Sequence, residues 1–282
     1  MRPNTGEGRY LELLRDVMLH GSRSDNRTDT PTRKVFGRFW TCDDVVEDFP
    51  LLTTKRVHWK SVVAELIWFL SGSTSAVRLR DMGCTIWDEW ADERGYLGPI
   101  YGKQWRSWSN IREWEKQGEG PTLLEWADQI QNVMDLLEKD PNSRRMIVSA
   151  WNVTDLQYMA LQPCHYAFQL QVQDGDLNMM VNMRSTDIFL GMPFNIASYA
   201  LLLRMFAHVT GYRARRLCFS LGDLHIYENH MEQGRIQLTR NQLDAPRVGL
   251  QDSIGSIFEF RPENIELRSY NPHAGLKGEV AI

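Results

Sequence analysis

The sequence has few cysteines and no paired arrangement of them. The four cysteines, Cys42, Cys84, Cys164 and Cys218, are widely and irregularly spaced, and no Cys-x-x-Cys motif occurs. This spacing excludes the disulfide framework of small secreted domains, so we expect free thiols. The seven histidines also lack metal-ligand spacing, because no His-Glu-x-x-His occurs. We therefore expect no bound metal.

Long apolar runs and runs of one charge are also missing. The chain contains no run of about 18 apolar residues, the length a bilayer span requires, and its first residues lack the apolar stretch of a signal peptide. We therefore expect a cytoplasmic protein without a membrane partner. The formal charge of -4 is spread without long single-sign runs, which gives no basic field for holding nucleic acid. A small-molecule partner is favoured.

No internal repeat and no Ser-, Gly- or Pro-rich linker divides the 282 residues. A chain of this length, 43% hydrophobic, can bury one large core and is marginal for two. We expect one domain over residues 1–282. A phosphate loop is absent too, since no Gly-Lys-Ser/Thr follows Gly95, Gly98 and Gly102, so we interpret these glycines as turn residues.

Apolar periodicity predicts three helices. Residues 58–70 carry large apolar side chains at spacings of three and four, and Glu65 shares their face. A second helix is predicted from about 122 to 139, with the polar stripe of a surface helix. A third is predicted over 195–209, after Pro193, with Gly211 as its C-cap.

Alternation predicts the strands. Residues 168–173 alternate apolar side chains with glutamines, and Asp174-Gly175 then leads into a second alternating run, which predicts a hairpin. Residues 217–227, 257–260 and 265–270 are interpreted as further strands. Because strands and helices do not alternate regularly, we expect an α+β fold.

Cys164 is the strongest candidate for chemistry. A lone cysteine in an apolar setting is more often an inert core residue. Two features favour a nucleophile: His165 is adjacent, and Arg184 should lie nearly opposite across the hairpin. Cationic neighbours lower the pKa of a thiol and favour the reactive thiolate.

Other candidates have simpler alternatives. Glu65 could belong to a solvent stripe, but its apolar face-mates predict burial, a raised pKa and a role in proton transfer. Arg144 and Arg145 could be ordinary surface charges or bidentate phosphate ligands. Trp87 and Trp90 could be core aromatics or the walls of a pocket for a flat heterocycle.

Together these residues resemble the thymidylate synthase family from roughly Asn26 to Ile282. The resemblance rests on nine ordered segments: NRTxTxT, LLTTKR, ELIWFL, TIWDEWADERGYLGPIYGKQWR, DPNSRRMIVSAWN, ALQPCH, RSTDIFLGMPFNIASYALL, GDLHIYENHMEQ and the C-terminal VAI. It implies a mixed sheet packed with helices, and a homodimer that associates through its sheet faces and shares its active sites.

The resemblance also implies roles at the nucleotide. Cys164 would add to C6 of dUMP and make C5 nucleophilic, and Asn195 would pair with the uracil edge. The residues implied to bind the phosphate are Arg27, Arg184 and Ser185, with Arg144 and Arg145 from the partner subunit. His225 and Tyr227 would bind the deoxyribose hydroxyl. The residues implied to assist catalysis are Glu65, His165, Tyr101 and Asp223.

The implied co-substrate is 5,10-methylenetetrahydrofolate. The residues that the resemblance assigns to its pocket are His58, Trp87, Trp90, Asp187, Leu190, Gly191 and Phe194. Ala281, with Ile282, would belong to a tail that closes over it. The products would be dTMP and dihydrofolate.

The sequence departs from the family pattern at three places near this chemistry. Asp29 and Pro31 replace two glycines of the loop after Arg27, which bears on phosphate binding. Met183 replaces the usual glutamine, and Leu221 and Leu224 flank Gly222-Asp223. Met183 and Leu224 are expected where water and hydride compete.

Two alternatives follow from these departures. The Met183 and Leu224 segments are similar to those of phage deoxycytidylate hydroxymethylases, so the runner-up is a dUMP 5-hydroxymethylase that makes 5-hydroxymethyl-dUMP and tetrahydrofolate. The more remote alternative is a nucleotide-binding regulatory protein without activity, which should have lost Cys164, Glu65 or the tail first.

Overall fold

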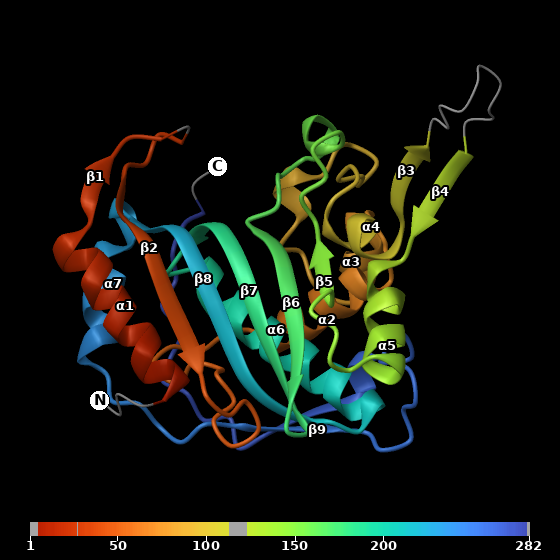
Figure 1. Ribbon diagram of the computed structural model, residues 1–282. Helices are drawn as coiled ribbons and strands as arrows, with labels where there is room; N and C mark the ends of the chain where they lie inside the picture. Colours follow the sequence, from red (N-terminus) through yellow and green to blue (C-terminus); the bar gives the residue numbers. More distant parts are fainter. Residues whose placement is uncertain (1–4, 27, 113–122, 281–282) are drawn as a thin grey trace.

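A computed structural model describes residues 5–26, 28–112 and 123–280 (Figure 1). Its helices are α1 (Gly6–His20), α2 (Trp59–Leu70), α3 (Ala76–Asp81), α4 (Tyr101–Arg106), α5 (Gln129–Lys139), α6 (Gly191–Thr210) and α7 (Met231–Thr239). Its strands are β1 (Ser22–Ser24), β2 (Thr32–Cys42), β3 (Trp108–Arg112), β4 (Leu123–Ala127), β5 (Ile147–Ser149), β6 (His165–Gln173), β7 (Asp176–Asp187), β8 (Arg213–Tyr227), β9 (Arg247–Leu250) and β10 (Ile265–Arg268). Within these residues, no helix is both long enough and apolar enough to span a bilayer.

A six-stranded mixed sheet forms the centre of the molecule. Its strand order is β1-β2-β8-β7-β6-β5, and only the β7–β8 pair is parallel. That pair is joined by α6, because parallel neighbours need a crossover and a helix supplies it. Two small antiparallel pairs, β3–β4 and β9–β10, lie outside this sheet. The expected α+β fold with a mixed sheet is confirmed.

The β6–β7 hairpin turns where the sequence predicts. Gln173 pairs with Asp176, and the two residues between them, Asp174 and Gly175, have positive φ angles of 52° and 80°. This backbone suits a two-residue hairpin turn, and Asp-Gly adopts it readily. The hairpin then carries Cys164 and Arg184 to neighbouring positions at its open end.

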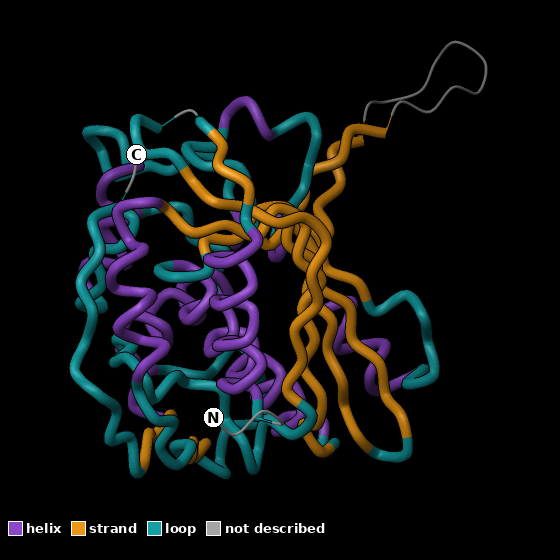
Figure 2. The backbone as a smooth tube through the Cα atoms, turned by 90° about the vertical axis from the view of Figure 1, so that its left-hand side faces the viewer, coloured by secondary structure: helices purple, strands orange, loops and turns teal. Residues whose placement is uncertain are grey.

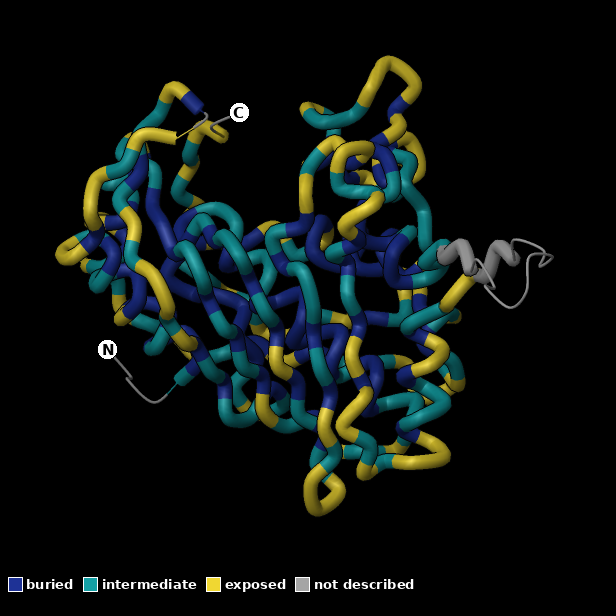
Figure 3. The backbone as a smooth tube through the Cα atoms, turned by 45° about the horizontal axis from the view of Figure 1, so that its top comes forward, coloured by how far each residue is buried: buried dark blue, intermediate teal, exposed yellow. Residues whose placement is uncertain are grey.

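The core lies between one face of the sheet and the helices. Figure 2 shows most of the helices on one side of the strands, and Figure 3 shows the buried stretches gathered in the middle of the molecule. Almost every residue of α2 is buried, as is most of α6. Burial on all faces explains why these two helices are apolar all round rather than striped.

The opposite sheet face is largely uncovered. Ile147, Gln169, Met180 and Cys218 are register partners across β5, β6, β7 and β8, so they share this face. Ile147 is 50% exposed and Met180 is 39% exposed. A sheet face left open with exposed apolar side chains such as these is typical of a surface that another protein covers.

Three predicted elements differ from the structure. The helix expected from about 122 begins at Gln129, because the Asp128 side chain accepts the Gln131 N–H at 3.0 Å and caps it there. Residues 123–127 instead form β4. The stretch 257–260 is a turn rather than a strand, with Ile257 and Phe260 buried in the core.

The third helix begins four residues earlier than predicted, at Gly191. Asp187 explains this start, because its Oδ1 accepts the N–H groups of Phe189 at 2.8 Å and Leu190 at 3.2 Å. Pro193 is tolerated in the first turn, where a helix does not need its N–H. Gly211 follows the last turn with a φ of 76°, as a C-cap should.

Candidate active site

A pocket of about 630 Å³ lies where β7 and β8 meet the start of α6. The predicted site residues that line it are Glu65, Trp87, Trp90, Cys164, Arg184, Ser185, Asp187, Leu190, Gly191, Phe194, Asn195, Asp223, His225 and Tyr227. They come from segments far apart in the sequence. The fold therefore gathers into one cavity the side chains that the motifs singled out.

Cys164 sits just before β6, directly beside an arginine. Arg184 Nη2 lies 3.8 Å from Cys164 Sγ, and the Arg184 backbone N–H donates to the Cys164 carbonyl at 2.9 Å. The same guanidinium donates to the carbonyls of Pro163 and Gln162, both at 2.8 Å. Arg184 thus holds the cysteine loop in place, and its positive charge favours the thiolate over the thiol.

Buried aromatic side chains adjoin Cys164. The Cys164 N–H donates to the Tyr101 hydroxyl at 2.7 Å, and the Tyr101 ring stacks on His165 with centroids 4.1 Å apart. His165 Nδ1 lies 2.8 Å from the Tyr199 hydroxyl. Burial lowers the pKa of His165 to about 3, so the imidazole is neutral. Both His165 and Tyr101 are buried, and neither lines the pocket.

Glu65 projects from α2 into the pocket. Its Oε1 accepts the Trp87 indole N–H at 2.7 Å, and the residue is buried. Burial raises the pKa of Glu65 to about 7, although the Trp87 hydrogen bond opposes this shift. A carboxyl that titrates near neutrality can both give and take a proton.

A polar row crosses the sheet on the other side of the pocket. Asp223 Oδ1 lies 2.8 Å from His225 Nδ1, and Lys34 Nζ lies 3.6 Å from Asp223 Oδ2. The hydrogen bond to His225 is the main reason that the pKa of Asp223 is lowered. Tyr227 packs edge-on against His225. The row presents hydrogen-bonding groups suited to a sugar or a similar polyhydroxy group.

The first turn of α6 supplies an amide. Asn195 lies one turn after Gly191, and its Oδ1 is 3.9 Å from the position that a Cβ on Gly191 would occupy. Among the described residues, no hydrogen bond ties up the Asn195 side chain. An amide that offers both a donor and an acceptor can read the edge of a heterocycle.

Apolar side chains line the outer part of the pocket. Trp87 and Trp90 pack edge-on with centroids 5.8 Å apart, and Leu190 and Phe194 line the same cavity. Two carboxylates lie beside this group: Glu65, which accepts the Trp87 N–H, and Asp187, whose Oδ1 accepts backbone N–H groups just before α6. Aromatic walls with a few polar groups nearby fit a flat heterocycle such as a pterin.

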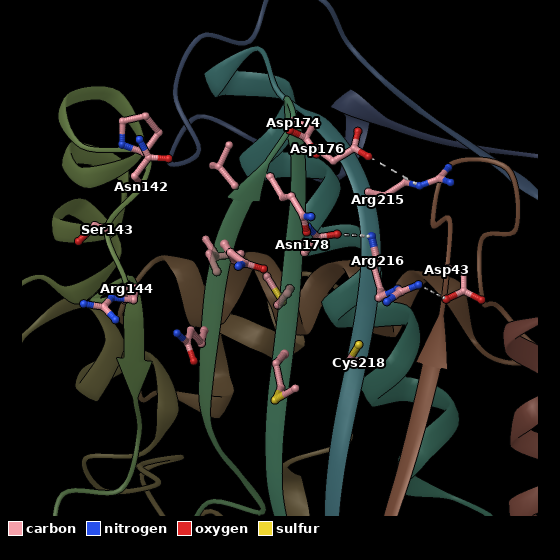
Figure 4. A pocket seen from close by; sticks show the side chains of 18 residues that line it. Asp43, Asn142, Ser143, Arg144, Asp174, Asp176, Asn178, Arg215, Arg216 and Cys218 are labelled. Atoms are coloured by element: carbon pink, nitrogen blue, oxygen red, sulfur yellow. Dashed lines mark hydrogen bonds and ion pairs between the residues drawn. The ribbon is translucent and has the colours of Figure 1, made fainter.

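A second hollow, of about 870 Å³, lies on the uncovered sheet face (Figure 4). It is lined by the glutamines of β6 and by Met180, Arg144, Arg215 and Arg216. Arg215 is paired with Asp176 at 3.8 Å and Arg216 with Asp43 at 3.1 Å. Arg144 is exposed at its edge and does not line the Cys164 pocket, nor does Arg145.

Three further predicted residues are not placed in the pocket. His58 is exposed at the start of α2, with its Nδ1 2.8 Å from Ser61 Oγ, and does not line the cavity. Arg27 and Ala281 fall outside the described residues. Asn26, which lines the pocket, bonds to two described residues that follow it: its Oδ1 accepts the Thr28 N–H at 2.7 Å, and its Nδ2 donates to the Thr30 carbonyl at 3.0 Å.

Met183 and Leu224 are both expected beside the reacting carbon, but the structure places only Met183 in the pocket. Met183 lines the pocket, but Leu224 is fully buried opposite Val35 and is not part of the lining. The expectation for Leu224 is wrong because a residue between Asp223 and His225 on a strand points to the opposite face.

One pocket residue, Lys34, and two buried residues outside the lining, Lys55 and Tyr199, are not among the site residues predicted from the sequence. Lys34 lies in the pocket because it pairs with His225 across β2 and β8. No local sequence pattern predicts this long-range strand pairing. Lys55 is buried beside Phe189, and burial lowers its pKa to about 8. Tyr199 could have been found, because it follows Asn195 by four residues on one helix face.

The thymidylate synthase family model matches residues 8–282, nearly the whole chain. Enzymes of that family transfer a one-carbon unit to C5 of a pyrimidine nucleotide, with methylenetetrahydrofolate as co-substrate.

Proposed function

Because the chain belongs to the thymidylate synthase family, we propose that it converts dUMP and 5,10-methylenetetrahydrofolate to dTMP and dihydrofolate. The observation that carries this proposal is the pairing of Cys164 with Arg184 at 3.8 Å in a pocket that also contains Glu65 and Asn195. That combination supplies a nucleophile, a proton carrier and a reader of the base in one cavity.

The nucleotide would be held by groups from β7, β8 and α6. Asn195 would pair with O4 and N3–H of uracil, and His225 and Tyr227 would bind the deoxyribose hydroxyl. Asp223 fixes the orientation of His225 by its hydrogen bond at Nδ1. Arg184 and Ser185 would bind the phosphate, together with Arg27.

Cys164 would open the reaction. Its thiolate adds to C6 of dUMP, which forms an S–C6 bond and moves the electron pair of the C5–C6 double bond toward C5 and O4. Glu65, with a pKa of about 7, would carry protons to and from the base, supported by His165 and Tyr101. C5 would then bond to the methylene carbon of the folate and lose its hydrogen as a proton. The folate nitrogen would leave with the electron pair of its bond to that carbon, which gives an exocyclic methylene, and hydride or water would add there as the thiolate leaves and the C5–C6 double bond re-forms.

Methylenetetrahydrofolate would supply the one-carbon unit and, in methylation, the hydride. Trp87, Trp90, Leu190 and Phe194 would hold its ring system, with Asp187, Gly191 and His58 as further ligands. The tail that contains Ala281 would close over it, and Val280 already lines the pocket. Excluding water there favours transfer of hydride.

We further propose that residues 1–282 form one catalytic domain that acts as a homodimer. Three observations support the dimer: the uncovered sheet face, its exposed Ile147 and Met180, and the place of Arg144 in the lining of the second hollow rather than of the Cys164 pocket. In a dimer joined by these faces, Arg144 and Arg145 would reach the phosphate site of the partner.

The second candidate is a dUMP 5-hydroxymethylase. The observation that favours it is Met183, which lines the pocket where the family pattern has a glutamine. Water would then complete the reaction instead of hydride. An inactive nucleotide-binding protein has less support, because Cys164, Glu65 and the pocket around them are all retained.

One experiment separates these candidates. The protein is incubated with dUMP and methylenetetrahydrofolate, the nucleotide product is weighed, and dihydrofolate is measured by its absorbance. dTMP with an equal amount of dihydrofolate supports methylation. 5-Hydroxymethyl-dUMP with tetrahydrofolate supports hydroxymethylation, and no product from folded protein supports the inactive alternative.

A further inference from the structure

The last described residues of the chain run along α7 and reach the pocket. The His273 N–H donates to the Thr53 carbonyl at 2.8 Å, and Arg240 donates to the Ala274 carbonyl at 2.7 Å. Further on, Gln233 Nε2 donates to the Lys277 carbonyl at 3.2 Å. Val280 then lines the pocket. The segment 273–280 is thus attached at intervals along its path.

His230 makes the contact nearest the pocket. Its Nε2 lies 2.9 Å from the Glu279 carbonyl oxygen. A carbonyl can only accept, so Nε2 must carry the hydrogen. The ring is fully buried, and its other nitrogen has no hydrogen-bond partner among the described residues. The bond to the tail is therefore the one that satisfies this imidazole within the described chain.

Gly278 allows the tail to come this close. A Cβ placed on Gly278 would lie 2.7 Å from His230 Nε2, 2.8 Å from His230 Cδ2 and 3.2 Å from Leu190 Cδ2. Real Cβ contacts are not that short, so a side chain here would push the tail away from the ring. The fit of Gly278 between His230 and Leu190 thus sets the position of Val280.

The same ring also packs against a residue of the pocket lining and a residue next to it. His230 packs on Phe189, with centroids 5.3 Å apart, and edge-on against Tyr227 at 5.9 Å. Phe189 precedes the α6 turn that lines the proposed folate site, and Tyr227 belongs to the proposed deoxyribose site. One buried imidazole therefore links the tail to the elements that surround both substrates.

We propose that His230 is a positioning residue that docks the C-terminal segment on the pocket through Glu279 and Gly278. It holds Val280 at the rim, where the segment helps to retain the folate. This inference rests on the proposed function only for the identity of the ligand, because the docking itself belongs to the protein without substrates.

The first test compares two glycine variants. Gly278→Ala places a methyl group against His230, whereas Gly275→Ala is a matched control, since nothing lies within 4 Å of a Cβ there. Hydrogen–deuterium exchange of peptides spanning residues 274–282 is followed by mass spectrometry. We expect exchange in Gly278→Ala to quicken by about three- to tenfold, the effect of losing a hydrogen bond of typical net strength, and Gly275→Ala to match the wild type.

The second test separates the packing of the His230 ring from its hydrogen bond to Glu279. His230→Phe keeps the packing on Phe189 but loses the donor, and His230→Gln keeps an N–H donor. We expect His230→Phe to loosen the tail and His230→Gln to restore much of the protection. Unchanged exchange in both Gly278→Ala and His230→Phe, or equal loosening in Gly275→Ala, overturns the docking role.

Kinetics then test the consequence for the folate. In Gly278→Ala, KM for methylenetetrahydrofolate should rise by about three- to tenfold while KM for dUMP changes by less than about twofold. A looser tail with an unchanged folate KM overturns the role in retaining the folate. If the wild type itself shows no folate-dependent turnover, the proposed function fails, and the exchange measurements still decide whether His230 docks the tail.

Discussion

The guanidinium of Arg184 lies 3.8 Å from the sulfur of Cys164 and also donates to the carbonyls of Pro163 and Gln162. One side chain therefore both shapes the loop that carries the nucleophile and supplies its counter-charge. The distance between the two residues follows from the hairpin, because Met183 pairs with His165 across β6 and β7.

Replacing Arg184 should affect both stability and activity. In Arg184→Ala the carbonyls of Pro163 and Gln162 lose their donors, and we expect the free energy of unfolding to fall by about 1 to 3 kcal/mol. KM for dUMP should rise by at least about tenfold through the lost phosphate contact. Urea denaturation and steady-state kinetics measure the two effects, and a variant with unchanged KM would remove Arg184 from the nucleotide site.

The β6–β7 hairpin shows which features of the site can be predicted from the local sequence. Cys164, Arg184 and the Asp174-Gly175 turn lie within one local pattern, so their proximity could be predicted and is confirmed. Glu65 was predicted to point inward because its helix face-mates are apolar, and the structure buries it with a raised pKa. Both inferences needed only periodicity over a few residues.

Other features depend on contacts that no local pattern encodes. Lys34 joins the pocket through its register with His225, and residues 123–127 form a strand because β3 pairs with them. The periodicity of 122–139 favoured a helix throughout, but the Asp128 cap starts the helix seven residues later. The extent of the domain and the roles of the site residues stay predictions.

Glu65 makes stability depend on pH in a specific direction. Its pKa is about 7 in the folded protein against an ordinary value of 4.5. Between these values the folded state binds more protons than the unfolded state, so the contribution of Glu65 to stability falls as pH rises. By this linkage the ionised carboxylate should cost on the order of 3 kcal/mol above pH 7.

Glu65→Gln removes this dependence. From about pH 5 to about pH 8, the variant should gain stability relative to the wild type, by an amount on the order of 3 kcal/mol. Turnover should fall by at least about a hundredfold, because the proton carrier is lost. Urea denaturation at both pH values tests the first part, and the idea fails if the two proteins respond to pH identically.

Asn195 should make the protein selective for uracil. The wild type is expected to prefer dUMP over dCMP by about ten- to a hundredfold in kcat/KM, since a mispaired buried amide costs about 1 to 3 kcal/mol. Asn195→Ala should lose most of this preference. Competition between the two nucleotides measures it, and equal rates with the wild type would contradict the assignment.

The uncovered sheet face should form the dimer. Met180→Asp places two carboxylates near each other across a symmetric interface, so we expect the variant to sediment as a monomer with little activity. Ile236→Asp is a matched control, because Ile236 and Met180 are each 39% exposed and Ile236 lies on α7. A Met180→Asp protein that stays dimeric would place the interface elsewhere.

The claim that Cys164 activates C5 of dUMP is tested most directly by following the hydrogen at C5. dUMP carrying tritium at C5 is incubated with methylenetetrahydrofolate and either the wild type or Cys164→Ala, and tritium released into water is counted. The wild type should release tritium only when the folate is present, whether the product is dTMP or its hydroxymethyl analogue, and Cys164→Ala should release none while remaining folded. Release at the wild-type rate from Cys164→Ala, or no release from the folded wild type with both substrates present, would contradict the account.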